Sequence, residues 1–219
     1  RAGEALGMRY RTILLTDIGR YGEAMENAMA SLRLHRELDT KEDELASLVV
    51  ACRAGLAQGV VGDLEPMLDA ATELLTGYDT EGFAPVVHAW RARVYALQGR
   101  LSEACDAIEL AGQSEVRAWP GQRVRASLNL ARVYRLLDAR DEAFTLAEEA
   151  LRLADASGYR HYAMRARRLI IECTDDEAAI ARHRRVAEAL ARSLAANLSR
   201  EDATSFLAMH GIKPRVSLI

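Results

Sequence analysis

The chain has 219 residues, of which 50% are hydrophobic, 28% charged and only 5% aromatic, with a formal net charge of −3. This length can bury a core, and the negative charge argues against a general nucleic-acid binder. The three cysteines lie far apart and form no metal-binding or disulfide pattern, which favours a reducing compartment such as the cytoplasm. No apolar run reaches the length of a membrane span, and no signal peptide opens the chain. Because the chain begins at Arg1 in mid-pattern, we interpret it as a piece of a longer protein.

Helix-breaking residues divide the chain into amphipathic stretches rich in Ala, Leu, Arg and Glu, which are good helix formers. We expect about ten helices of roughly 12–20 residues, joined by short turns that make neighbours antiparallel. Three pairs with capping-box spacing are expected to start helices. These pairs are Thr40 with Asp43, Thr174 with Glu177, and Ser199 with Asp202. The predicted breaks lie at Gly19, Asp39-Thr40, Gly59 to Gly62, Gly77 to Gly82, Gly99, Trp119 to Gly121, Asp138, Ser157-Gly158 and Thr174 to Asp176.

A pair made of an acidic residue and the residue that follows it recurs along the chain at spacings of 40, 40, 39 and 35 residues. Each pair lies shortly after a predicted turn. These pairs are Glu23-Ala24, Asp63-Leu64, Glu103-Ala104, Glu142-Ala143 and Glu177-Ala178. The helix before each turn carries a small residue at a fixed place. These small residues are Thr12, Cys52, Ala92, Ala131 and Ala166. Small residues let two helix backbones approach closely, so we expect the helices to cross at these positions.

This arrangement resembles the tetratricopeptide repeat (TPR), a helix-turn-helix unit that stacks into a superhelix. The segments "SLNLARVYRLLDARDEAFTLAEEAL" (127–151) and "RVYALQGRLSEA" (93–104) match the repeat best. The period is nearer 40 residues than the usual 34, and the closing proline is missing. Longer variants of this kind occur in bacterial signalling proteins, often after a kinase or nucleotide-binding module, and the resemblance implies that context here.

The resemblance implies an all-α fold, a right-handed superhelical array of antiparallel helix pairs. We expect one domain at 1–198 with five units and, at 199–219, a capping helix over the last unit followed by a tail. The expected units span about 4–39, 40–80, 83–117, 121–157 and 158–198.

No catalytic or nucleotide-binding motif occurs, and the five histidines are scattered over different predicted helices. We therefore expect a protein that is not an enzyme and holds no metal or cofactor. The basic run from Arg182 to Arg185 lies on a long predicted helix, which spreads its charges over more than one face. A solvated face explains this run better than nucleic-acid binding does.

Arginine follows the small crossing residue in four of the five units, and the first unit has Ile13 there. These four are Arg53, Arg93, Arg132 and Arg167. In TPR arrays this position faces the concave groove, so the resemblance implies a row of arginines along it. Arg9, Arg125 and Arg135 are further groove candidates. Arginine binds carboxylate and phosphate through a planar fork, which would suit an acidic partner. The alternative is a solvated face paired with Glu and Asp of adjacent helices.

Two functions stay open. The first is a scaffold that binds a protein or peptide, acidic if the arginines contribute, and that forms a homodimer if its exposed ends stack. The second is a sensor whose groove holds a small acidic ligand or signalling peptide and changes pitch. An open groove would favour the scaffold, whereas a closed pocket with convergent polar groups would favour the sensor.

Overall fold

The fold is all-helical in a computed structural model that describes residues 1–80, 82–114 and 118–213. Within these ranges eleven helices and no strand occur. Their bounds are α1 (Ala2–Asp17), α2 (Tyr21–Glu37), α3 (Lys41–Gln58), α4 (Glu65–Tyr78), α5 (Ala84–Leu97), α6 (Leu101–Ser114), α7 (Pro120–Leu136), α8 (Arg140–Ala156), α9 (Arg160–Cys173), α10 (Glu177–Ala195) and α11 (Arg200–Met209).

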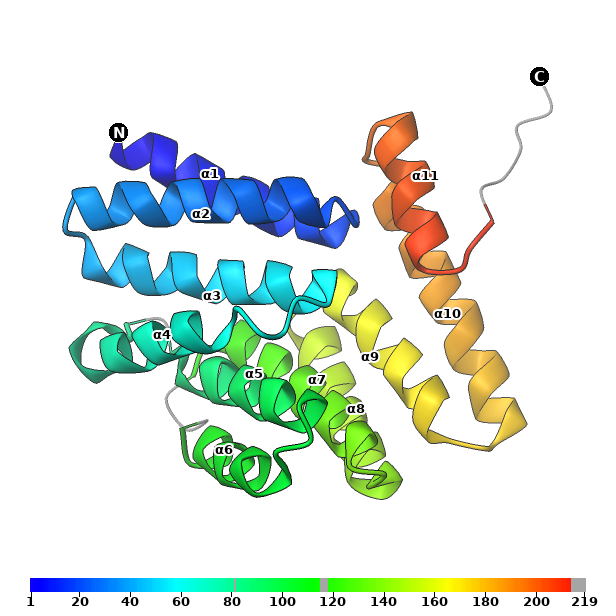
Figure 1. The fold of residues 1–219 in the computed structure, drawn as a ribbon. Helices are drawn as coiled ribbons and strands as arrows, with labels where there is room; N and C mark the ends of the chain where they lie inside the picture. The colour runs from blue at the N-terminus through cyan, green and yellow to red at the C-terminus, as the bar shows by residue number, and fades with distance from the viewer. Residues whose placement is uncertain (81, 115–117, 214–219) are drawn as a thin grey trace.

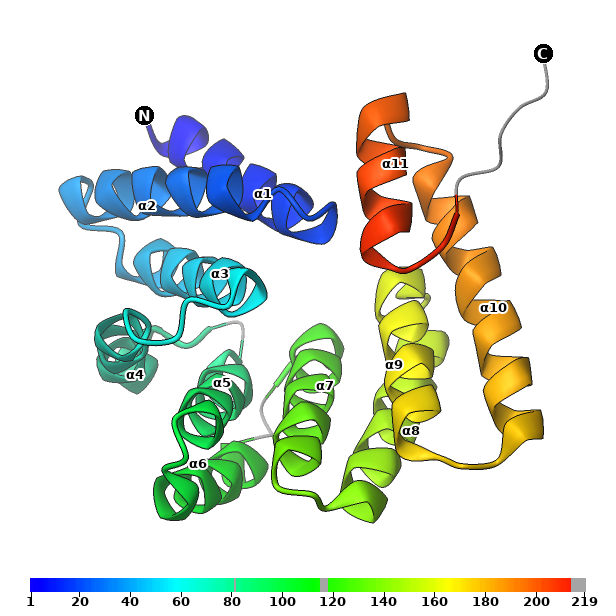
Figure 2. The same ribbon diagram turned by 45° about the vertical axis from the view of Figure 1, so that its right-hand side comes forward.

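Successive helices pack as pairs, α1 with α2 through α9 with α10, and the pairs follow one another along a curve (Figure 1). The first helix of each pair also contacts the first helix of the next, from α1 to α3, α5, α7 and α9. Figure 2 shows α3, α5, α7 and α9 toward the inside of this curve, with α4, α6 and α10 outside. The predicted all-α array of helix pairs is confirmed.

The small crossing residues are buried, as their spacing predicts. Thr12, Ala92, Ala131 and Ala166 are 0% exposed and Cys52 is 1% exposed. The second helices of the pairs also bury small residues. In α8 these are Ala143, Ala147, Ala150 and Ala154, and all four are completely buried. Leucine, valine and isoleucine then fill the space between crossing points, for example Leu128 and Ile170 between the last two pairs.

Helix caps follow the sequence only in part. Ser199 caps α11 as predicted, because its hydroxyl accepts the Asp202 N–H at 3.1 Å. Thr40 does not cap α3 with its side chain; its hydroxyl lies 2.9 Å from His35 Nδ1 instead. The predicted cap at Thr174 is also wrong, because Asp176 accepts the N–H groups of Ala178 and Ala179 and so starts α10. At Thr40 the His35 ring contacts the hydroxyl, whereas at α10 Asp176 takes the capping role instead of Thr174.

Helix α11 contacts both ends of the array. Its Phe206 and Leu207 are buried in a cluster that includes Ala191 of α10 and Leu15 of α1. Tyr21 of α2 lies with its hydroxyl 3.0 Å from Met209 Sδ, and Arg20 pairs with Asp202 at 3.2 Å. Met209 Sδ also lies 3.3 Å from the position that a Cβ on Gly19 would take, and Gly19 has a φ of +86°. This helix therefore closes the gap between the first and last pairs.

Substituting Ala191 by Leu tests the close approach on α10. Ala191 is 0% exposed, and extra methyl groups there would push α11 or α9 outward. We expect Ala191→Leu to lower the free energy of unfolding by about 1–3 kcal/mol, measured by urea denaturation. Ala189→Leu, on the exposed side of the same helix, is the matched control and should change it by less than about 0.5 kcal/mol. Equal effects would contradict the packing assigned to α10.

Candidate anion-binding cavity

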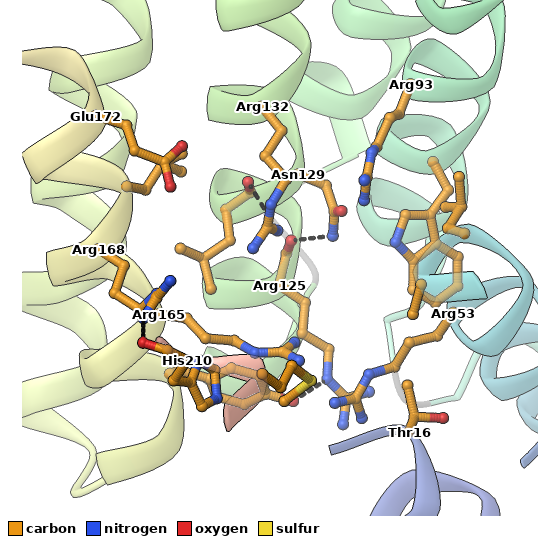
Figure 3. A pocket seen from close by; sticks show the side chains of 17 residues that line it. Thr16, Arg53, Arg93, Arg125, Asn129, Arg132, Arg165, Arg168, Glu172 and His210 are labelled. Atoms are coloured by element: carbon orange, nitrogen blue, oxygen red, sulfur yellow. Dashed lines mark hydrogen bonds between the residues drawn. The ribbon is translucent and has the colours of Figure 1, made fainter. Parts of the chain in front are cut away.

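The inner helices enclose a cavity of about 220 Å³. Residues of α1, α3, α5, α7 and α9 line it, and Met209 and His210 of the α11 end close one side. Figure 3 shows arginine side chains from four different helices pointing into this space. The lining arginines are Arg53, Arg93, Arg125, Arg132, Arg165 and Arg168.

Four of the seven arginines singled out in the sequence line this cavity. They are Arg53 on α3, Arg93 on α5, and Arg125 and Arg132 on α7. Their shared place follows from the repeat, because equivalent positions of successive inner helices face the same concave surface. Their role in binding stays a prediction, since position alone does not show what they bind.

The other three predicted arginines do not line the cavity. Arg9 lies in the middle of α1 and pairs with Asp43 at 2.9 Å. Arg135 is half-exposed and pairs with Glu172. Arg167 pairs with Asp155 of α8 at 3.1 Å, so it faces the outer helix and not the concave surface. None of these three residues is in the cavity lining, and their role in binding stays a prediction.

Arg167 was misplaced because the last unit was aligned at a spacing of 35 residues. The residues of α7 and α9 that line the cavity are instead 40 residues apart, as in Arg125 with Arg165. By the same register Arg132 corresponds to Glu172, so the last unit has a carboxylate where the second, third and fourth units carry an arginine. Sequence reasoning missed Arg165 and Arg168, which a constant 40-residue period would have placed in the cavity.

One carboxylate, Asp17 at the end of α1, serves three basic groups. Arg53 donates to Asp17 Oδ1, and Arg165 Nη2 lies 3.6 Å from the same oxygen. His161 Nδ1 lies 3.4 Å from Asp17 Oδ2. Even so, Arg53 Nη1 and His161 Nε2 are buried without a hydrogen-bond partner within the described residues. Arg53 Nη1 is therefore a buried donor without an acceptor among the described residues at this corner of the cavity.

The remaining four lining arginines have no carboxylate partner among the residues that the structure describes. Arg125 donates to the Tyr162 hydroxyl, and Arg168 donates to the backbone carbonyl of His210. Arg132 reaches only the Leu128 carbonyl, at 3.3 Å. Arg93 makes no hydrogen bond or ion pair in the described ranges. Glu172, the one carboxylate in the lining, is already paired with Arg135.

Burial and mutual repulsion destabilise the charged form of these side chains. Burial, followed by the charges of Arg165 and Arg93, lowers the pKa of Arg132 to about 9. Burial, with Arg165 second, also lowers the pKa of Arg93. The pKa of Arg165 falls through burial although Asp17 opposes the change. An anion in the cavity would relieve each of these costs.

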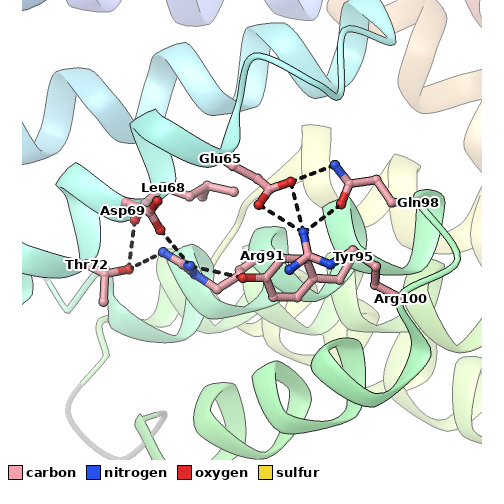
Figure 4. Close-up of polar contacts among 8 residues, drawn as sticks. All are labelled: Glu65, Leu68, Asp69, Thr72, Arg91, Tyr95, Gln98 and Arg100. Carbon is pink, nitrogen blue, oxygen red and sulfur yellow. Dashed lines mark hydrogen bonds and ion pairs between the residues drawn. The ribbon is translucent and has the colours of Figure 1, made fainter.

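Two arginines outside the cavity are paired with acids. Arg91, two residues from Arg93 on α5, meets Asp69 at 2.8 Å and donates to Thr72 at 2.9 Å (Figure 4). Arg100 meets Glu65 at 2.9 Å and stacks over Tyr95, with its Cζ 4.1 Å from the ring centroid. The alternative interpretation, arginines paired with adjacent acids, is therefore right for these residues and does not describe the cavity.

Other side chains near the cavity have structural surroundings. Trp90 is 3% exposed within the core and also lines the cavity. Burial raises the pKa of Cys52 to about 12, so its thiol stays protonated. In the described ranges no group of three or more His, Cys, Asp or Glu side chains could hold a metal ion. No helix among those residues is long and apolar enough to cross a membrane.

No family model matches the sequence, and no curated protein matches it. Two solved structures of a putative kinesin light chain with nearly identical TPR-like repeats, from Podosopora anserina, are similar to it in fold. Each is 18% identical with a TM-score of 0.50, and covers 96% of this chain and 97% or 98% of its own. The chain has a TPR-like fold. At this identity the likeness concerns the fold, so any binding function must be argued from the cavity.

We predict that the ligand-free TPR-like array becomes more stable when Arg132 is replaced by Met. The change removes a desolvated cation that other arginines repel and keeps much of the side-chain volume. The free energy of unfolding should rise by about 1–3 kcal/mol in urea denaturation. Arg91→Met is the control and should lower it, because that change breaks the contacts with Asp69 and Thr72. A loss of stability in Arg132→Met would contradict the assigned charge imbalance.

The lowered pKa values of two histidines beside the cavity predict that the folded chain loses stability in acid. Burial lowers the pKa of His161 to about 3, against the opposing charge of Asp17. Burial, then Arg168 and Arg165, lowers the pKa of His210 to about 4. Because the unfolded chain protonates first, near its ordinary pKa of about 6.5, folding stability is complete above that pH and falls below it.

Between about pH 7 and pH 5 each histidine should remove about 1–2 kcal/mol from the free energy of unfolding. Urea denaturation at several pH values measures this loss. A variant with His161→Gln and His210→Gln should lose less stability over the same interval. If its pH profile matched that of the unmodified chain, the assignment to these two imidazoles would be wrong.

Proposed function

We propose that this chain is a non-catalytic binding module that recognises an anionic segment of a partner protein in its concave cavity. One observation carries the proposal: six arginines converge on one cavity whose lining contains a single carboxylate, Glu172. In a chain with a formal net charge of −3, this gathering of positive charge is local.

The unsatisfied guanidinium groups supply the free energy for binding. Their desolvation and repulsion are already present in the folded chain, so an incoming anion gains charge-assisted hydrogen bonds without paying those costs again. The inner helices also hold the arginines in place, which reduces the entropy lost on binding. A Glu- or Asp-rich segment that entered the cavity would bring acceptors to Arg93 and Arg132, which line it.

A second candidate is a sensor for a small anionic ligand. The observation that favours it is the closure of one side of the cavity by Met209 and His210. Polar groups then converge on an enclosed space, which suits a small molecule better than an extended surface does. A ligand that touched α5, α7 and α9 together would also alter how the helix pairs stack.

The wider setting rests on the TPR resemblance alone. It supports a cytoplasmic module within a larger bacterial signalling protein, and stacking of exposed ends would give a homodimer. Binding of nucleic acid is not part of the proposal, because the arginines are enclosed and an extended polyanion needs several accessible phosphate contacts.

Replacing Arg93 by Gln tests the proposal. Arg93→Gln removes a charge that has no acceptor in the described residues, so it should weaken binding of a fluorescein-labelled Asp/Glu-rich peptide by about 10- to 100-fold. Fluorescence anisotropy measures the affinity. The peptide of equal length with Asn and Gln in place of the acids should bind neither protein.

Arg91→Gln provides the matched control, because Arg91 lies on the same helix but pairs with Asp69 outside the cavity. Its affinity for the acidic peptide should equal that of the unmodified chain. Circular dichroism should show all three proteins equally helical. An equal loss in Arg91→Gln and Arg93→Gln, or no binding of the acidic peptide at all, would refute recognition of an acidic segment in the cavity.

A further inference from the structure

We propose that the preferred occupant of the cavity is a compact oligophosphate, a small molecule or group that carries two or more linked phosphoryl groups. This inference rests on the proposed function in one respect, because both place an anion among the same arginines. It goes further by naming the chemical class of the ligand.

The charge balance sets the first requirement. Arg93, Arg125, Arg132 and Arg168 lack a carboxylate partner in the described part of the chain, while Asp17 neutralises part of the charge on Arg53 and Arg165. A ligand that satisfies this cavity must therefore bring several negative charges. One carboxylate brings one charge, whereas a single phosphoryl group brings between about 1.5 and 2 at neutral pH.

The available volume sets the second requirement. The cavity is about 220 Å³, below the range of about 300–1,000 Å³ typical of pockets for drug-sized ligands. An acidic peptide with the same charge needs several residues, and its side chains point alternately to opposite sides of an extended backbone. Linked phosphoryl groups place comparable charge in a much smaller volume, with acceptor oxygens in all directions.

The direction of the donors sets the third requirement. The six guanidinium groups approach from α3, α5, α7 and α9, so they surround the space instead of forming one flat surface (Figure 3). Arg53 is 10% exposed, and its Nη1 atom is buried without a partner within the described residues. His210 Nε2, at the α11 end of the cavity, is another such orphaned atom. A phosphoryl group presents three acceptor oxygens that do not lie in one plane with the phosphorus, whereas a carboxylate presents two oxygens in one plane.

Asp17 gives an internal example of anion binding at this site. Its carboxylate contacts Arg53, Arg165 and His161 at one corner, and each of the three comes from a different turn of α3 or α9. The same helices present Arg168 on α9, while α7 presents Arg132. A ligand phosphoryl group would therefore extend a pattern of guanidinium–anion contacts that the chain already makes.

Isothermal titration calorimetry with inorganic tripolyphosphate tests this inference. We expect one binding site per chain, with an affinity at least about tenfold higher than for citrate or orthophosphate. Arg93→Gln and Arg132→Gln should each weaken tripolyphosphate binding by about tenfold or more, and Arg91→Gln should leave it unchanged. In a Trp119→Phe background, Trp90 is the remaining tryptophan and should report binding through its fluorescence, because it lines the cavity.

The outcomes separate this inference from the proposed function. If the Asp/Glu-rich peptide binds through Arg93 but tripolyphosphate binds no better than citrate, the oligophosphate inference falls and the proposed function stands. Several weak tripolyphosphate sites, or equal losses in Arg91→Gln and Arg93→Gln, would also overturn the inference, because they indicate general surface charge. If neither the Asp/Glu-rich peptide nor tripolyphosphate binds, both the proposed function and the oligophosphate inference are wrong.

Discussion

The structure depends on the close approach of helix backbones at small residues. Ala131 on α7 and Ala147 on α8 are completely buried. Each of the remaining helix pairs likewise buries small residues, which are Ala, Ser, Thr or Cys. Close approach fixes which face of each helix is covered, and the repeat then gives successive inner helices the same exposed face. In the second, third and fourth units, the side chain one residue beyond the crossing point is thereby directed into the cavity, as Arg53, Arg93 and Arg132 are.

The concave face carries a cost that the other faces avoid. Where α4 meets α5, acids accompany the arginines, and Asp69 with Glu65 leaves Arg91 and Arg100 neutralised. Among the described residues, Asp17 and Glu172 are the acids within reach of the cavity arginines, and Glu172 is already paired with Arg135. Hydrophobic residues at these positions would stabilise the ligand-free array more. Proteins accept such a loss of stability at functional sites, which is why we propose that an anion completes the cavity.

The sequence predicted the features of the fold that depend on residues close together in the chain. The period of small residues predicted the helix pairs and their crossing points. The TPR resemblance implied groove positions for seven arginines, and four of these residues line the cavity. It failed for Arg167, because α10 starts in a different register from the other second helices, as the exposed Ala178 shows. The contacts of α11 with α1 and α2 could not be predicted either. Residues 182 and 188 positions apart meet there, and no periodic pattern encodes contacts at that separation.

Closure of the array links the ends of the chain to the cavity. In a regular solenoid each unit touches only its neighbours, so distant units fold and move independently. Here Asp17 of the first pair holds Arg165 of the last, and α11 adds Met209 against Tyr21. The same residues, or their immediate neighbours, form the wall of the cavity. An anion that competes with Asp17 for Arg53 and Arg165 would therefore weaken a contact between the first and last pairs while it strengthens contacts among α5, α7 and α9. If an anion binds as we propose, occupancy of the cavity would be coupled to the curvature of the array through one carboxylate, Asp17.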